Sequence, residues 1–252
     1  YKKEVTAQQP ATSKEEGNLV AFSGPDFKAT FDKQSGLLVS YRYKKQEYIH
    51  NGQGPRPFFW RAPTDNDYGA KLPVRLKAWK EASYQEPKAE SFQVTPGSNA
   101  TTVKVTYRFP QTDARWDITY KIYASGVIKV DNRFMAEGDQ APMIPRVGLR
   151  MQLPESFTDL TYYGRGPKEN YRDRRTSQFI GEYAIPVKDM YEPYVRPQEN
   201  NHRTDIYWCA LTDKTQRGLL LIADRTFELN ASNYSLESMD SGDTIDNGTP
   251  RT

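Results

Sequence analysis

The chain has 252 residues, and its 35 basic and 32 acidic side chains leave a net charge of +3. It contains no run of Lys and Arg typical of nucleic-acid binding and no apolar run approaching the length of a membrane span, so we expect a soluble protein, cytoplasmic or periplasmic, with neither kind of partner. One cysteine, Cys209, and two histidines exclude a disulfide within the chain and argue against a zinc site, and we assign no cofactor or metal ligand to this chain.

The chain opens with a polar segment, residues 1–17, which we expect to be a linker from an upstream domain. Since it begins with Tyr1 and not with methionine, we expect it to be a piece of a longer protein. Residues 18–252 are expected to form one domain. Its first element is a hairpin, because apolar side chains alternate on both sides of a turn at residues 33–36.

Residues 58–69 read Phe-Phe-Trp-Arg-Ala-Pro-Thr-Asp-Asn-Asp-Tyr-Gly and lie in a long irregular segment, residues 44–75. Aromatic rings beside carboxylates and an amide suit a sugar, whose flat C–H face packs on a ring while its hydroxyls bond to the polar groups. A loop of this length is usually functional or interfacial. The same cluster can also tie down a domain core, and both interpretations stay open. The candidate residues are Trp60, Arg61, Asp65, Asn66 and Asp67.

Alternating apolar residues then predict a series of strands, at residues 103–109, 116–122, 128–134, 147–153 and 218–223. Strands at this spacing, with turns between them, indicate an antiparallel β-sandwich. Helical periodicity is weak, and residues 71–82 are the one place where we expect a short helix. The stretch 154–205 is rich in Gly, Pro, Arg and Tyr and is expected to be irregular.

Two further polar segments hold candidate residues. The first, residues 162–175, contains Gly164 and Gly166. Pro167 comes directly after these glycines and no helix is predicted to follow, which argues against a dinucleotide loop. The second, residues 189–202, is a proline-stiffened stretch that can bind a polar ligand or form a domain interface. The candidates from both are Glu169, Asn170, Arg172, Tyr191, Tyr194, Arg196, Glu199, Asn200 and His202.

Catalytic interpretations of these residues are weaker. His202 could act as a general base only with a carboxylate in reach. A retaining glycosidase needs two carboxylates about 5 Å apart, and the acidic residues available for such a pair are Asp65, Asp67 and Glu169. After Met239 the tail is polar and expected to be mobile. Its spaced acidic residues lack the ligand order of a calcium loop; they are Asp240, Asp243 and Asp246.

Three segments match conserved motifs of one family in its own order. Trp60-Arg-Ala-Pro-Thr-Asp-Asn-Asp67 resembles W-R-A-P-x-D-N-D, residues 164–174 resemble G-x-G-P-x-E-N-Y-x-D-R, and residues 189–200 resemble D-M-Y-x-P-Y-x-x-P-x-E-N. These motifs are typical of the C-terminal, small-chain domain of the β-galactosidases of glycoside hydrolase family 2. The resemblance covers residues 18 to about 240.

The resemblance implies an all-β fold, a large antiparallel two-sheet sandwich of the galactose mutarotase-like (supersandwich) type, truncated at its C-terminus. It implies a parent that hydrolyses terminal β-galactosyl residues with glutamates of a (β/α)₈ barrel. Since a barrel alone takes about 250 residues, it lies outside this chain, as do the family's Mg and Na ions, and we assign no catalytic residue here. The implied partners are the barrel, the galactoside sugar and, in an oligomeric parent, further copies.

Two alternatives to this interpretation remain. One is a free-standing carbohydrate-binding module, in which Trp60, Arg61, Asp65, Asn66 and Glu169 would line a concave pocket. The other is a mutarotase-type epimerase, in which His202 and a carboxylate would move protons at the anomeric centre.

Overall fold

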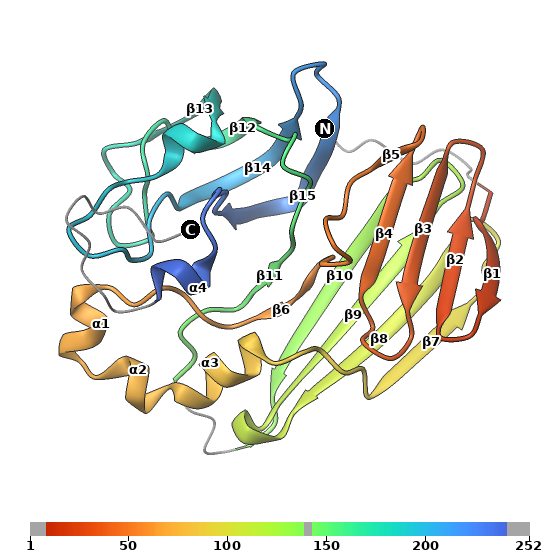
Figure 1. Ribbon diagram of the computed structural model, residues 1–252, viewed down its shortest axis with the longest axis horizontal. Helices are drawn as coiled ribbons and strands as arrows, with labels where there is room; N and C mark the ends of the chain where they lie inside the picture. Colours follow the sequence, from red (N-terminus) through yellow and green to blue (C-terminus); the bar gives the residue numbers. More distant parts are fainter. Residues whose placement is uncertain (1–8, 139–142, 241–252) are drawn as a thin grey trace. The chain divides into compact units, whose positions relative to one another are not determined.

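The computed structural model describes residues 9–138 and 143–240, and strands dominate it, with 46% strand and 12% helix (Figure 1). The predicted all-β class is therefore confirmed. The chain divides into two compact units, of which the first is Tyr1–Trp60 with Leu76–Pro154 and the second is Arg61–Arg75 with Glu155–Thr252. None of the helices in the described part of the chain is long and apolar enough to cross a membrane.

The first unit contains two larger antiparallel sheets. One has the strand order β1-β2-β3-β4-β5, the strands being Thr12–Glu16, Leu19–Ser23, Phe27–Asp32, Leu38–Tyr43 and Gln46–Glu47. The other has the order β10-β9-β8-β7, with β7 Ser91–Thr95, β8 Thr101–Phe109, β9 Ala114–Ile122 and β10 Ile128–Ala136. The predicted hairpin is β3 and β4, and its turn contains Gly36 at φ +75°, a conformation that favours glycine.

Aromatic side chains join these two sheets into a sandwich. Phe31 on β3 has its ring centroid 5.0 Å from that of Tyr120 on β9 and 6.1 Å from that of Phe92 on β7. Phe22 on β2 packs edge-on to Phe31 at 5.8 Å. All but Phe92 are fully buried, and burial of such rings contributes about 1.5–3 kcal/mol each. The predicted two-sheet sandwich thus lies in the first unit.

The aromatic residues before the polar motif belong to this unit's core. Phe58 ends the short strand β6, Arg56–Phe58, which pairs with β11, Gly148–Arg150. Phe59 is completely buried and contacts the helix α3, Lys77–Tyr84, through Trp79 at 4.8 Å. Phe59 also packs on one ring from each of β8, β9 and β10, namely Phe109, Trp116 and Phe134. The short helix η1, Pro110–Thr112, joins β8 to β9.

The second unit is a four-stranded antiparallel sheet with the order β13-β12-β14-β15. Its strands are β12 Asp159–Gly166, β13 Phe179–Pro186, β14 Arg203–Thr212 and β15 Gly218–Leu229. The predicted strand at 218–223 is confirmed within β15. Short helices complete the unit: α1 Asp65–Gly69, α2 Leu72–Arg75, η2 Val187–Met190 and α4 Leu236–Met239.

The expectation of an irregular stretch at residues 154–205 is wrong for β12 and β13. The glycines that suggested turns lie inside β12, where a side chain would not fit. A Cβ atom on Gly164 would lie 2.4 Å from the Ile206 side chain, and one on Gly166 would lie 2.2 Å from the Tyr162 hydroxyl. These glycines therefore permit close approach of neighbouring groups within a strand.

Other expectations need correction at the element ends. Residues Thr12–Glu16, expected within a linker, form the edge strand β1 because their backbone pairs with β2. The short helix expected at 71–82 is two helices, α2 and α3, and the strand expected at 147–153 shrinks to β11. The strands predicted at 103–109, 116–122 and 128–134 are confirmed. The domain boundary at residue 18 stays a prediction, and the tail residues Asp243 and Asp246 lie outside the described residues.

Candidate functional site

Trp60 belongs to the first unit, whereas the other candidate residues belong to the second. Only 2% of its surface is exposed, and the Lys80 ammonium lies 5.9 Å from its ring centroid. A ring that stacks on a sugar must present one face to solvent. In this chain Trp60 is therefore a core residue of the first unit.

The segment that follows Trp60 is fixed by one carboxylate. Asp67, 6% exposed, accepts hydrogen bonds from Arg61 at both oxygens, at 2.8 and 3.1 Å. Its side chain also accepts from the Thr64 backbone N–H at 3.0 Å, while the Thr64 hydroxyl accepts from the Asp67 N–H at 3.3 Å. This reciprocal arrangement is a capping box, which starts α1. The hydrogen bonds that fix the segment at residues 61–67 are therefore made by residues of that segment itself.

Two other polar residues of this motif face solvent. Asp65 has an exposed side chain (75%), and Asn66 is exposed next to it on α1. Arg196, from the third motif, contacts two residues of α1: its Nε is 3.7 Å from Asp65 Oδ1 and its guanidinium is 4.7 Å from the centroid of the Tyr68 ring. Arg196 therefore connects the first motif to the third.

Glu169 is the centre of a second cluster. Its side chain is only 7% exposed and accepts hydrogen bonds from Arg174 at 2.6 Å, from the Tyr194 hydroxyl at 2.5 Å and from the Asn201 backbone N–H at 2.7 Å. Burial and the neighbouring Glu169 carboxylate raise the pKa of Tyr194. Three donors, one of them charged, therefore converge on the Glu169 carboxylate. Both of its oxygens are engaged as hydrogen-bond acceptors within the protein.

Asn170 joins the second motif to β14. It is completely buried, and its backbone N–H donates to the His202 carbonyl at 2.8 Å. Its side-chain oxygen accepts from the Thr204 N–H at 3.0 Å and from the Thr204 hydroxyl at 2.7 Å. Its side-chain amide donates to the carbonyls of Arg165 and Lys168. Its side-chain donors and acceptor are all engaged, so the buried Asn170 links the backbone of the second motif to that of β14.

The third motif is tied to the first through the backbone. The Glu199 N–H donates to the Ala62 carbonyl at 3.0 Å, and Glu199 is 4% exposed. Asn200, 2% exposed, accepts weakly from the Glu192 N–H at 3.4 Å and donates to the Gln198 carbonyl at 2.9 Å. Tyr191 packs on Tyr234 with ring centroids 4.8 Å apart. Within the second unit, the three sequence motifs, the first of them from Arg61 onward, therefore converge on one polar cluster.

His202 has partners that the motifs do not contain. Its ring is 6% exposed and lies between Asn230 and Glu228, with Nδ1 2.7 Å from Asn230 Oδ1 and Nε2 3.1 Å from Glu228 Oε2. Arg172, whose side chain is 82% exposed, donates to the other Glu228 oxygen at 2.6 Å. The hydrogen bond from His202 is the main reason why the pKa of Glu228 is lowered to about 2. Glu228 and Asn230 follow no recognisable sequence pattern, so sequence reasoning missed both.

The cluster has the chemistry of a scaffold. Asp67 and Glu169 accept from arginines and backbone N–H groups, Glu228 from Arg172 and His202, and Glu199 from the Asn230 amide, and these bonds fix the loops that bear them. The two ring nitrogens of His202 are both engaged, which does not suit a proton shuttle at a sugar. In the described part of the chain, no three His, Cys, Asp or Glu side chains are grouped so as to hold a metal ion.

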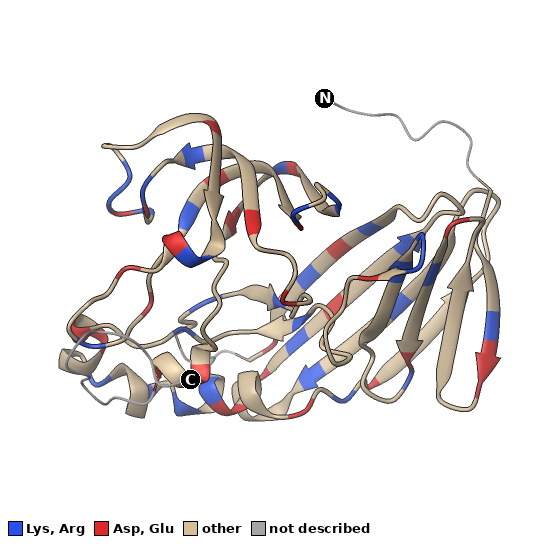
Figure 2. Cartoon of the chain, turned by 45° about the horizontal axis from the view of Figure 1, so that its top comes forward, with Lys and Arg blue, Asp and Glu red and all other residues tan. Residues whose placement is uncertain are grey.

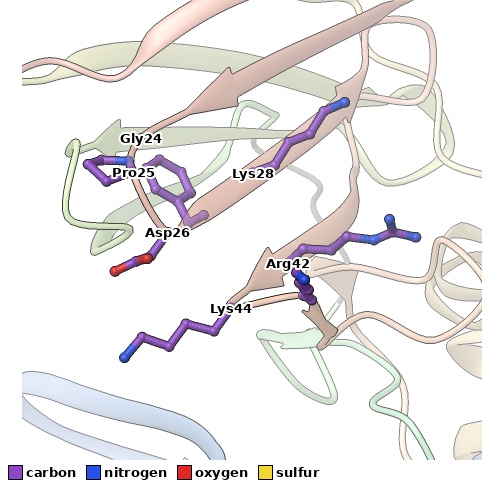
Figure 3. Close-up of a pocket in the computed structure, with 8 residues that line it drawn as sticks. Gly24, Pro25, Asp26, Lys28, Arg42 and Lys44 are labelled. Atoms are coloured by element: carbon purple, nitrogen blue, oxygen red, sulfur yellow. The ribbon is translucent and has the colours of Figure 1, made fainter.

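Charge elsewhere is spread over the surface. Lys and Arg segments alternate with Asp and Glu segments along the ribbon in Figure 2, in keeping with the small net charge. An open depression of about 440 Å³ lies at one end of the first unit, beside the turn at Gly24–Asp26, and is lined by several cations (Figure 3). Their side chains spread apart around its rim, and Arg42 is bound to Glu47 at 3.1 Å. This arrangement does not converge on a ligand.

Comparison with known proteins agrees with the three motifs. Residues 23–246 match the family described as Beta galactosidase small chain. The chain is 36% identical over 232 residues to a β-galactosidase of Priestia megaterium, covering 92% of this chain and 22% of that protein. It is 34% identical over 227 residues to one of Lactobacillus delbrueckii subsp. bulgaricus, and 32% identical over 203 residues to one of Halalkalibacterium halodurans. Against these relatives it spans 20% to 22% of their length.

Proposed function

The chain belongs to the β-galactosidase small-chain family, and from that premise we propose that it serves as the small-chain domain of a β-galactosidase, in which it supports a catalytic barrel that it does not itself contain. The parent would hydrolyse terminal β-galactosyl residues of β-galactosides with retention. The chain's own part would be to brace the barrel and to help form the wall of the galactoside site.

The convergence of the three motifs supports this proposal. Segments far apart along the chain meet through Glu199 N–H to Ala62 and Arg196 to Asp65, and the second and third motifs meet through Asn201 N–H to Glu169. Such a cross-linked set of loops is rigid, because Glu169 accepts hydrogen bonds from donors of two segments and Asp67 fixes the segment to which it belongs. A rigid polar face suits a domain that must hold a neighbouring active site in shape. The absence of an uncommitted acid–base pair among the cluster's buried carboxylates suits a supporting role better than a catalytic one.

The solvent-facing residues at the edge of this cluster are the natural points of contact with the barrel or the sugar. They are Asp65, Asn66 and Arg172. Each is polar and exposed in this chain, so each can exchange water for a partner group at little cost. Galactose hydroxyls and the polar side chains of a barrel loop both match them chemically.

A chimera tests the proposal. The 232 matched residues of the Priestia megaterium β-galactosidase would be deleted, and this chain would be fused in their place. We expect the deleted protein to be inactive, the chimera to hydrolyse a chromogenic β-galactoside, and this chain alone to show no turnover. Turnover by the chain alone would contradict the supporting role. An inactive chimera that folds, judged by its thermal transition, would contradict the proposed placement in the parent.

A further inference from the structure

The environment of the His202 ring determines where its protons must be. Both ring nitrogens lie opposite an oxygen atom, Nδ1 at 2.7 Å from Asn230 Oδ1 and Nε2 at 3.1 Å from Glu228 Oε2. A carboxylate oxygen can only accept a hydrogen bond, so Nε2 must donate. Whether Nδ1 must also donate depends on which end of the Asn230 amide faces it.

The orientation of the Asn230 amide is decided by its other end. Its second side-chain atom lies 3.1 Å from Glu199 Oε1 and 2.8 Å from the Asn200 carbonyl oxygen. Both of these are acceptors, so that atom must be the NH₂ group. The opposite end, facing His202 Nδ1, is then the oxygen. Two acceptors flank the ring, and both bonds form only when both ring nitrogens are protonated.

We propose that His202 is a protonation-dependent clasp that fastens the end of β15 to the third motif. As the imidazolium it bonds Glu228 on β15 and Asn230 just beyond it, while its own carbonyl holds Asn170 of the second motif. When one proton leaves, a ring lone pair faces an oxygen lone pair, and that bond is lost. The clasp therefore closes in mild acid and loosens as the pH rises. This inference goes beyond the proposed supporting role, because it adds a pH response to it.

The charges around the ring favour the closed state. Glu228 on β15 is the nearest, in direct contact with Nε2. On the turn of the second motif, Arg172 is paired with Glu228, and Tyr171 stacks on the imidazole with centroids 4.9 Å apart. Stacking with an aromatic face favours a cationic ring.

The remaining charged neighbours nearly offset one another. Arg174, over the Tyr171 ring at 4.6 Å, is paired with Glu169. Glu199 reaches the histidine only through the Asn230 amide. Arg203 opposes the imidazolium charge, since its Nη1 donates to the His202 carbonyl at 3.2 Å. The Glu228 carboxylate contacts the ring itself, at 3.1 Å from Nε2, whereas the bond of Arg203 is to the backbone carbonyl, so attraction dominates at the clasp.

Imidazole NMR tests the clasp directly, because the chain has only two histidines and the variant His50→Gln leaves His202 alone. We expect both ring nitrogens of His202 to show the ¹⁵N shifts and attached protons of an imidazolium in mild acid. As the pH rises, we expect the Asn230 side-chain amide and the backbone signals of Glu228 and Asn170 to move with the same midpoint as the ring. A ring that stays neutral in one tautomer from pH 5 to 8, or neighbours that do not follow its titration, overturns the proposal.

Stability measurements give a second test with a matched control. The variant His202→Gln, which cannot be protonated, should unfold several degrees below the parent chain at pH 5.5, with the difference shrinking towards pH 8.5. The exposed His50→Gln variant should keep the parent's pH profile. If His202→Gln does not fold, Glu228→Gln replaces it, because removal of the facing carboxylate should move the His202 midpoint to lower pH. An unmoved midpoint, or equal pH profiles for His202→Gln and the parent, overturns the proposal.

Discussion

Asp65 and Asp67 flank Asn66 in the first motif, and replacing each of them should lower the free energy of unfolding by very different amounts. Asp67 is 6% exposed and joins four hydrogen bonds with Arg61 and Thr64. Asp65 has a largely exposed side chain and one distant ion pair, at 3.7 Å, with Arg196. Both lie on the five-residue helix α1, so changes at the two positions share the same local backbone. We therefore expect Asp67→Ala to destabilise the fold and Asp65→Ala to leave its stability nearly unchanged.

The size of the Asp67 effect follows from its contacts. Loss of a helix-capping interaction costs about 1 kcal/mol. The bidentate Arg61 pair is partly exposed, with 33% of the Arg61 side chain accessible, which reduces a charge-assisted bond from its buried range to about 1–2 kcal/mol. The sum is about 2–3 kcal/mol for Asp67→Ala, or roughly 5–10 °C in Tm for a domain of this size. Asp67→Asn, which retains one acceptor oxygen, should lose about half of that free energy.

Urea unfolding followed by circular dichroism at pH 7 measures these differences. Asp65→Ala is the matched control and should stay within about 0.5 kcal/mol of the parent chain. An additional scan in 1 M NaCl separates the contributions, because salt screens the partly exposed ion pair but leaves the capping box. If Asp67→Ala unfolds at the same urea concentration as Asp65→Ala, the capping box does not hold this segment and the argument fails.

Three further changes have defined outcomes. Glu169→Gln removes the charge that holds Arg174, so urea unfolding should show a loss of about 2–3 kcal/mol. Gly36→Ala should lower the free energy of unfolding by more than about 3 kcal/mol or prevent folding. The backbone of Gly36 has φ +75°, and the new Cβ would lie 2.5 Å from the Tyr107 hydroxyl. Soluble yield and urea unfolding measure this effect. Burial raises the pKa of Cys209 to about 12, so a thiol reagent at pH 8 should label it only after denaturation.

Regular alternation made the first unit predictable. Strands β8 and β9 have apolar residues at every second position, and these residues form their buried faces. Strand β10 was found from the same alternation, although Asn132 interrupts it and the strand is largely exposed. The second unit gave no such signal, because buried positions of β12 are occupied by Gly164 and Gly166, whose small size serves close packing and leaves no apolar pattern. Strand β1 was missed for the opposite reason: all its residues are exposed, and only pairing with β2 makes it a strand.

The candidate site was predictable as a set of motifs but not as a set of contacts. Sequence order shows that Glu169 and Tyr194 are polar residues of two segments; it cannot show that one accepts a hydrogen bond from the other. Long-range pairing depends on the fold that brings the segments together. Glu228 and Asn230, which bind His202, stand outside every motif and become visible only when β15 is placed beside β14.

The polar residues that suggested a sugar site are for the most part committed to one another. Asp67 is neutralised by Arg61 within the first motif, and Glu169 by Arg174 within the second. A sugar could reach those buried carboxylates only by displacing their arginine partners, which costs more than the few hydroxyl bonds it would gain. What the cluster offers to a partner is therefore its exposed edge, where Asp65 and Arg172 have most of their side chains in solvent. If the proposed placement in a β-galactosidase is right, changes at this edge should alter turnover in the chimera without altering stability, whereas changes at Asp67 or Glu169 should do both.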